Sequence, residues 1–268
     1  QETTDTAPLA EYTIQAVHEA PYLEFLRFAP LQTPGEAIRA RCHPGGDMMR
    51  LPGHIEAQAG FYIADATTTV STETWRTVLG DVRAAIAGAE RLLAGDSRIA
   101  VICRTQGRHA HAGRAARGCH LNHAAAAASF LRESLERVAI LSLGEHHANG
   151  TQSIFLERGD IACISVHGDP ASRYPFYNGY PDERGESAGD GGNLNLVIEA
   201  DANERAAAAA LDDACDAITR LAPDAVVVDI EALLSGPYRS LSPGGPIAAA
   251  ERLSILLNRP VMVISCES

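Results

Sequence analysis

A regular alternation of short apolar segments and helical segments over residues 99–265 constrains the fold of this chain most strongly. The apolar segments are Ile99–Cys103, Val138–Leu143, Ile161–Val166, Asn193–Ile198, Ala225–Ile230 and Val261–Ser265. They are continuously apolar rather than alternating, which indicates strands that are buried on both faces. The sequence therefore predicts an α/β fold with a mainly parallel sheet and helices on both faces.

Helical spacing of apolar residues separates these strands. The predicted helices are Tyr22–Phe28, an amphipathic helix that Ser71 or Thr72 caps and Gly95 ends, Asn122–Arg137, Glu204–Leu221 and Ile247–Leu257. Asp201 and Glu204 have the spacing of a capping box at the start of the fourth helix. The rest of residues 1–60 is rich in Pro and Gly, so we expect an irregular N-terminal region. No linker or repeat interrupts the chain, which predicts a single domain over residues 1–268.

The charge of the chain argues against two classes of partner. Its 268 residues carry a net charge of −12, and no basic cluster provides a surface for nucleic acid or an anionic membrane. No apolar run approaches the roughly 20 residues that span a bilayer, and no signal-peptide pattern is present. The six cysteines form no CxxC pair, so we expect buried free thiols in a reducing compartment, the cytoplasm or an organelle matrix.

Polar residues follow each predicted strand. Arg108, His109 and His111 come after the first, His146 and His147 after the second, His167 after the third, and Asp229 and Glu231 after the fifth. The carboxyl ends of parallel strands meet at one edge of the sheet, where such folds bind ligands. We therefore expect the functional residues at this edge.

Five segments carry a family resemblance: ICRTQGRHAHAG, GCHLNHAAAAASFLRES, RVAILSLGEHHANGTQSIF, ISVHGDPASRYPFYNGYPDERGESAGDGGNLNL and PDAVVV. In them the chain resembles the histone deacetylase superfamily, and most of all its bacterial acetylpolyamine amidohydrolase branch. The resemblance runs from about Tyr12 to the end and implies an arginase/deacetylase-like three-layer fold. It also leads us to expect that the family's first strand and helix, and the part after its last strand, are missing here.

The resemblance implies a zinc ion held by Asp, His and Asp. His146 matches the ligand histidine, but the first ligand Asp falls on Gly144. The second falls on Glu231 or Asp229, because that segment is two residues shorter than the family pattern. Glu145 is a poor substitute for the first, since successive strand residues point to opposite faces.

The other family positions have changed as well. The paired proton-handling histidines fall on Arg108 and His109, and a guanidinium cannot accept a proton near neutral pH. An acid that would orient them falls on Ser142, and the catalytic Tyr falls on Ser268. The resemblance assigns the substrate channel to Gly118, Gly192 and His120, and the first two replace aromatic rings.

Two functions remain open. The first is a non-catalytic member, without a cofactor, that acts as a structural or binding subunit with protein partners or as a homo-oligomer. The second is a zinc-dependent amidohydrolase that acts on acetyl-lysine or acetylpolyamine amides, with zinc held by His146, Glu231 or Asp229, and His109 or Glu145. A carbohydrate- or nucleotide-binding module has no positive feature behind it, and the loop at residues 185–192 lacks the phosphate-binding GxxxxGK pattern.

Structural roles compete with each functional assignment. We expect His146 and His147 to bond to backbone carbonyls, and Arg108 to form a salt bridge with Glu145, Asp229 or Glu231 rather than to bind an anion. His120 and His123 are expected on the surface at a helix start. Cys119 and Cys266 are soft-metal donors in type, but their spacing gives no support for a site with His109 and His146.

Overall fold

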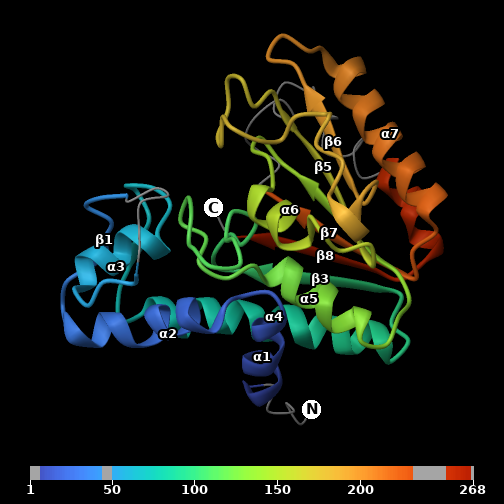
Figure 1. The fold of residues 1–268 in the computed structure, drawn as a ribbon. Helices are drawn as coiled ribbons and strands as arrows, with labels where there is room; N and C mark the ends of the chain where they lie inside the picture. Colours follow the sequence, from blue (N-terminus) through green and yellow to red (C-terminus); the bar gives the residue numbers. More distant parts are fainter. Residues whose placement is uncertain (1–6, 44–49, 232–251, 267–268) are drawn as a thin grey trace.

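The computed structural model describes residues 7–43, 50–231 and 252–266, and a parallel sheet forms its centre (Figure 1). Its strands are β3 (Arg98–Cys103), β4 (Val138–Leu143), β5 (Ile161–Gly168), β6 (Asn193–Ile198), β7 (Ala225–Ile230) and β8 (Val261–Cys266). Their order is β3-β8-β7-β4-β5-β6, and every neighbouring pair is parallel. The predicted α/β class is confirmed.

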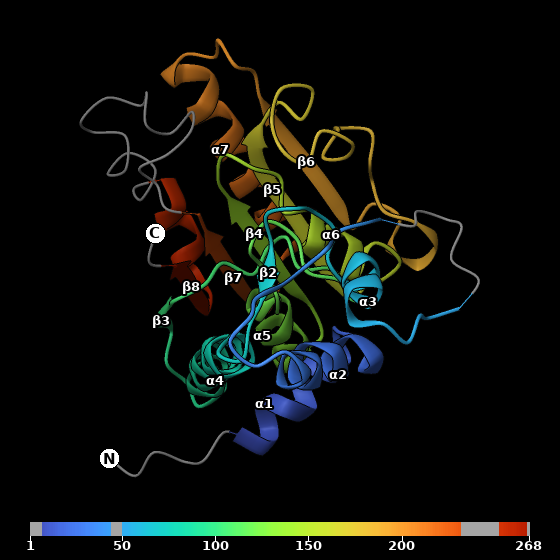
Figure 2. The same cartoon turned by 90° about the vertical axis from the view of Figure 1, so that its left-hand side faces the viewer.

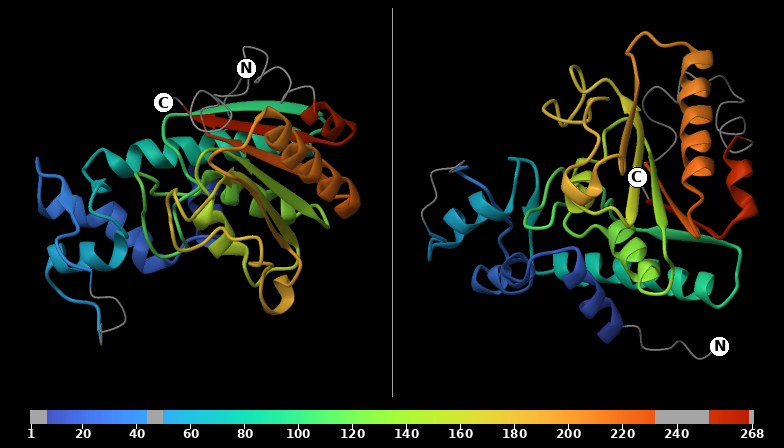
Figure 3. Two further views of the ribbon diagram at one scale, coloured as in Figure 1. Left: turned by 90° about the horizontal axis from the view of Figure 1, so that it is seen from above. Right: turned by 45° about the vertical axis from the view of Figure 1, so that its right-hand side comes forward.

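Helices cover both faces of this sheet, as Figures 1 and 3 show. The helices beside it are α4 (Thr74–Leu93), α5 (His123–Arg132), α6 (Asn149–Phe155) and α7 (Glu204–Leu221), with a 3-10 turn η5 (Ser254–Asn258). On one face, α4 and α5 bury Ile140, Val227 and Met262. On the other, α7 and η5 bury Leu141 and Val228. Alternate residues of a strand thus enter different cores, which explains why these strands are apolar throughout.

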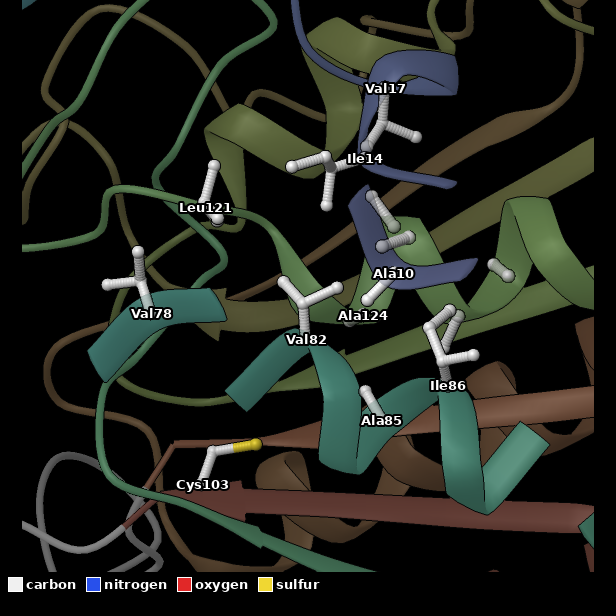
Figure 4. Packing of buried hydrophobic residues seen from close by; sticks show 14 of the residues in the cluster. Ala10, Ile14, Val17, Val78, Val82, Ala85, Ile86, Cys103, Leu121 and Ala124 are labelled. Carbon is white, nitrogen blue, oxygen red and sulfur yellow. The ribbon is translucent and has the colours of Figure 1, made fainter. Parts of the chain in front are cut away.

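Helix α4 lies between the sheet and the N-terminal helices. Figure 4 shows Val82 and Ile86 directed toward Ala10 in the first helix, and Val78 on the side of Leu121. The opposite side of α4 packs closely against β3 and β8. This close approach depends on Gly88, because there is no room for a side chain at that position. A Cβ at Gly88 would come closer than 3.0 Å to Val101 and to Met262.

The N-terminal region is mainly helical over residues 7–32, and another helix follows at residues 55–62. It contains α1 (Ala7–Thr13), α2 (Ala20–Phe28), α3 (Ile55–Tyr62) and the short antiparallel pair β1 (Ile38–Arg39) and β2 (Thr69–Val70). Figure 2 shows α1 and α2 beside α4 and α5, on the side away from α7. Helix α2 confirms the helix predicted over Tyr22–Phe28. The irregular expectation was wrong for α1 and α3, because Ala10 in α1 and Ala59 and Tyr62 in α3 pack into the main core.

Several element ends differ from their predicted positions. Helix α5 ends at Arg132, five residues early, and Asn203 rather than a capping box caps α7 by accepting from Ala206 N at 3.1 Å. Helix α4 begins at Thr74 with no side-chain cap. Residues 247–251 of the helix predicted over Ile247–Leu257 lie outside the described residues, and its last four residues belong to the 3-10 turn η5.

The six thiols divide into two groups. Cys42 is exposed, and Cys103, Cys119, Cys163, Cys215 and Cys266 are buried and free. Burial raises the pKa of Cys119, Cys163 and Cys266 to about 12. The expectation of buried free thiols holds for five of the six positions.

The connections place a topological switch point next to β4. The chain runs from β4 to β5 and β6 in one direction, and β7 and β8 then fill the sheet in the other direction. The crevice between β4 and β7 is therefore where an open α/β sheet holds a ligand, at the carboxyl ends of the strands. No helix in the described part of the chain is long and apolar enough to cross a membrane.

Candidate functional site

The ends of β4 and β7 bring four of the predicted site residues together. Gly144 and His146 follow β4, and Asp229 and Glu231 lie at and just after the end of β7. The backbone N–H of Glu231 donates to Leu143 O at 2.9 Å, which fixes the end of one strand against the other. The two carboxylates and the histidine therefore share the crevice at the switch point.

Arg108 fills the centre of this crevice. Its side chain is 1% exposed and lies 3.1 Å from Asp229 Oδ1 and 3.8 Å from Glu231 Oε2. It also donates to the carbonyls of Leu143 and Asp229, each at 3.2 Å. Burial alone would lower the pKa of Arg108, but the two carboxylates outweigh burial and raise it. The predicted salt bridge forms with Asp229 and Glu231, whereas Glu145 pairs with Arg173 instead.

The missing side chain at Gly144 makes room for this arrangement. A Cβ there would come closer than 3.0 Å to Arg108 Nη1, Glu231 Oε2 and Glu231 Cβ. An aspartate at this position and the Arg108–Glu231 pair therefore compete for the same space.

His146 is held by two side chains rather than by backbone carbonyls. Its Nδ1 lies 3.0 Å from Glu231 Oε1, and its backbone N–H donates to Glu231 Oε2 at 3.2 Å. Its Nε2 lies 2.9 Å from Nη2 of Arg117. Burial would raise the pKa of Glu231, but the hydrogen bond with His146 and the charge of Arg108 lower it to about 2. Glu231 is thus an anion that is already neutralised from two sides.

His109 is poorly suited to proton transfer. Its Nδ1 lies 2.7 Å from Asn149 Oδ1, while its Nε2 is buried without a hydrogen-bond partner. Burial, together with the adjacent Arg108, lowers its pKa to about 3. It stays neutral at pH 7 and is a weak base there.

The other histidines are structural in their contacts. His147 Nδ1 lies 3.3 Å from Ser165 Oγ, and His167 lies between Ser165 and the carbonyl of Gly179. His120 and His123 are buried, so their expected surface location was wrong. His120 Nε2 bonds Thr69 O at 2.8 Å.

The expected channel positions lie in different places: Gly118 follows Arg117, whose side chain bonds His146, whereas Gly192 lies away from His146. Gly118 leaves open space, with no atom within 4 Å of where a Cβ would lie. Gly192 precedes β6, where Cys163 N donates to its carbonyl at 2.8 Å, so it lies at the amino ends of the strands, across the sheet from the crevice. Buried Ser142 lies within β4, paired with Asp229 and Ser165. Ser268 lies outside the described residues.

A profile of the histone deacetylase domain matches residues 1–230. The chain belongs to the histone deacetylase family. It is 36% identical over 222 residues to acetylpolyamine amidohydrolase 1 of Pseudomonas aeruginosa, covering 80% of this chain and 64% of that protein. It is also 36% identical over 224 residues to the acetylpolyamine amidohydrolase of Mycoplana ramosa, covering 81% and 66%.

Solved structures of the family have the same fold. The crystal structure of acetylpolyamine aminohydrolase from Burkholderia pseudomallei matches with a TM-score of 0.82 at 31% identity, covering 95% of this chain and 76% of that one. A histone deacetylase homologue from Aquifex aeolicus matches with a TM-score of 0.74 at 19% identity, which shows the fold alone. The chain spans slightly less than two thirds of the length of the two curated relatives named above.

The described residues do not fit the zinc site of the deacetylase family. No group of three His, Cys, Asp or Glu side chains in the described part of the chain is placed to hold a metal ion. Both ring nitrogens of His146 already have partners, and the carboxylates of Asp229 and Glu231 face a guanidinium. A cation that replaced Arg108 would have to break this buried ion pair.

Sequence reasoning missed three residues of this deacetylase-like site. Arg117 reaches His146 and stacks on Tyr174, with its guanidinium carbon 5.1 Å from the ring centroid. Tyr174 also packs edge-on against His109 at 5.1 Å, and Asn149 holds His109. The sequence stretches HHANG and RYPFYNG contain Asn149 and Tyr174 and were available as signals, whereas nothing in the sequence singles out Arg117.

Proposed function

We propose that this chain is a non-catalytic member of the histone deacetylase family that acts as a structural or binding protein. The observation that supports this most is the position of Arg108. Its guanidinium lies against both carboxylates in the space above Gly144, where the resemblance places a ligand acid. In this proposal the chain keeps the family fold, and the side chain of Arg108 fills the place of the metal ion.

Electrostatics favours the ion pair over a metal at this place. An arginine stays charged in proteins, so a divalent cation held by Asp229 and Glu231 would lie beside a fixed positive charge. At about 5 Å the repulsion is roughly 6 kcal/mol with an effective dielectric constant of about 20. Arg108 neutralises both carboxylates by itself, so no such repulsion arises.

A partner surface is part of the proposal. Strand β3 is at one edge of the described sheet, and Ile102 in it is 71% exposed. Exposed sheet edges with apolar side chains pair readily with other chains. We expect a protein partner or a second copy of this chain, rather than nucleic acid or a membrane, inside a cell.

The second candidate is a zinc-dependent deacetylase with a rearranged site. Its support is the 36% identity to proteins named acetylpolyamine amidohydrolases. In this case His146, Glu231 and Asp229 would hold the zinc, and Arg108 would have to move away. The substrate would be an acetyl-lysine or acetylpolyamine amide.

Metal content and turnover distinguish the two candidates. The first predicts that the purified chain, incubated with zinc and desalted, retains no stoichiometric metal by mass spectrometry and releases no acetate from acetyl-lysine or acetylpolyamine substrates. One zinc per chain together with turnover would establish the second candidate instead.

A paired variant tests the structural reason. Gly144→Asp alone should fold poorly, because the new side chain competes with Arg108 and with Glu231, which Arg108 holds in place. Combined with Arg108→His, the same change should be tolerated and should raise zinc retention above that of the wild type. If Gly144→Asp alone is as well folded as the double variant, Arg108 does not occupy the ligand position.

A further inference from the structure

A second cleft, of about 500 Å³, lies away from the crevice between β4 and β7. Its walls come from Glu19, His43, Gly60, Phe61, Ile63, Ala64, His111, Ala112, Gly113, Arg114 and Ser153. None of the charged residues around Arg108 lines it. In Figure 1 the green loop after β3 lies between α3 and α6, and the lining includes Phe61 of α3 and Ser153 of α6. The volume is in the range of small-molecule sites.

Backbone hydrogen bonds hold the walls of this cleft in place. Glu19 N donates to Ala112 O at 2.9 Å, and His111 N donates to Arg114 O at 3.0 Å. Ala64 N donates to Ala115 O at 2.8 Å, which ties the segment after α3 to the same loop. Three segments far apart in sequence are thus fixed relative to one another, so a ligand would meet a preformed site.

The cleft presents one free charge of each sign. Glu19 and Arg114 both line it, and neither forms an ion pair with a described residue. The Glu19 carboxylate lies against Gly113, because a Cβ there would be 2.9 Å from its Oε2. Opposite charges that share a cleft without pairing are complementary to a ligand with both an ammonium and a carboxylate group.

The floor of the cleft offers neutral hydrogen-bonding groups rather than a nucleophile. Ser153 Oγ lies 2.7 Å from His111 Nδ1 and donates to Gly150 O at 2.9 Å. His111 Nε2 lies 3.1 Å from Asn149 Nδ2, which can only donate. The proton of His111 is therefore on Nδ1 and points at Ser153, so the histidine does not activate the hydroxyl. Burial also lowers the pKa of His111 to about 4.

We propose that this cleft binds a free α-amino acid. Arg114 takes the carboxylate, Glu19 takes the ammonium group, and Phe61, which is 43% exposed, provides an apolar wall for the side chain. Ser153 Oγ can accept one further hydrogen bond from the ammonium group, whereas both ring nitrogens of His111 are already bonded. This inference holds whether or not the crevice between β4 and β7 turns over a substrate.

Calorimetric titration of the full chain tests the proposal. The probes are the twenty free amino acids, and for each binder its amide, which lacks the carboxylate, and its N-acetyl derivative, which lacks the ammonium group. We expect at least one amino acid to bind at least tenfold more tightly than either derivative. Absence of binding by every amino acid at 10 mM, or equal binding of the derivatives, overturns the proposal.

Three variants assign the contacts. Arg114→Gln should remove the preference for the amino acid over its amide, and Glu19→Gln should remove the preference over the N-acetyl form. Gly113→Ala keeps both charges but displaces the Glu19 carboxylate, so it should weaken binding about tenfold. Arg184→Gln is the matched control, because Arg184 is an exposed arginine outside this cleft. Binding that Arg114→Gln and Glu19→Gln leave unchanged contradicts the assignment, while metal content and turnover report separately on the proposed function.

Discussion

Two buried polar clusters differ in how they satisfy their members. The charged cluster consists of Arg108, Asp229, Glu231 and His146. The amide cluster consists of Gln152, Asn193, Asn195 and Glu183. Gln152 Oε1 accepts from Asn193 and Asn195, each at 2.9 Å, and Gln152 Nε2 donates to Glu183 at 2.6 Å. The first cluster balances buried charges, and the second mainly distributes hydrogen bonds.

The two clusters differ in how many partners each member has. Asn193 Nδ2 also donates to Glu183 O, and Asn195 Nδ2 also donates to Tyr180 O, so each amide keeps a partner if Gln152 is lost. In the charged cluster, Arg108 is the one arginine in the described residues within ion-pair distance of Asp229 and Glu231. A network whose members each have more than one partner loses stability gradually, whereas a buried ion pair depends on both partners.

The largest expected effect is that of Arg108→Met. The variant leaves two buried carboxylates without their arginine, and we expect a loss of about 3–5 kcal/mol in the free energy of unfolding. Urea denaturation measures it. The exposed Arg184→Met serves as a control and should stay within about 0.5 kcal/mol of the wild type. A loss below about 1 kcal/mol for Arg108→Met would remove the contrast between the clusters.

Acid should act on the buried histidines and on the charged cluster in different pH ranges. Burial lowers the pKa of His18, His111 and His167 to about 4, so the unfolded chain binds more protons than the folded one between pH 6.5 and 4. Stability is therefore full above pH 6.5 and falls on acidification, by about 1 kcal/mol per histidine at pH 5.5. Glu231, with its lowered pKa, adds a loss only as pH falls from 4.5 toward 2.

A histidine variant tests how much one buried histidine contributes to the loss of stability between pH 7 and pH 5. His167 bonds the carbonyl of Gly179, whose N–H is held by Glu183, so it belongs to the side of the amide cluster. Urea unfolding of His167→Gln at pH 7.0, 6.0 and 5.0 should show a smaller decline than the wild type over this range. An equal decline would show that His167 does not contribute to it.

A smaller effect is expected for Gln152→Met. The change removes one acceptor from two amides and one donor from Glu183, but all three keep other partners. We expect a loss of about 1–2 kcal/mol in urea denaturation. A loss as large as that of Arg108→Met would show that the amide cluster is no more redundant than the charged one.

The smallest expected effect is the interaction free energy between Arg108 and Gln152, one member of each cluster. The two clusters share no hydrogen bond or ion pair, so the effects of Arg108→Met and Gln152→Met should add within about 0.5 kcal/mol. A double-mutant cycle by urea unfolding measures this. A coupling above about 1 kcal/mol would join the two clusters into one network.

The sheet could be predicted from the sequence because its signals are local. Val138–Leu143, Asn193–Ile198, Glu204–Leu221 and Ala225–Ile230 have the bounds expected from their apolar patterns alone. The N-terminal helices were not predicted, apart from residues 22–28, because their stability comes from packing on α4 rather than from a strong periodic pattern. Tertiary contacts of that kind leave little trace in a short window of sequence.

The candidate site could be predicted in part. The resemblance pointed to Gly144, His146 and Arg108, and elementary electrostatics pointed to a salt bridge at Asp229 or Glu231. The space that Gly144 opens for Arg108 could not be predicted, because it depends on contacts between distant parts of the chain. Gly144, Asp229 and Glu231 lie 36, 121 and 123 positions after Arg108. For the same reason Arg117 was missed and Gly192 was assigned to the wrong edge of the sheet.

The distribution of the thiols makes this protein easy to label at one site. Five sulfurs lie in the interior, three with pKa values near 12, and Cys42 is exposed. A maleimide fluorophore at neutral pH would therefore attach at a single position. Cys42 precedes His43 in the wall of the second cleft, so the dye would sit where it can report occupancy as a change in emission.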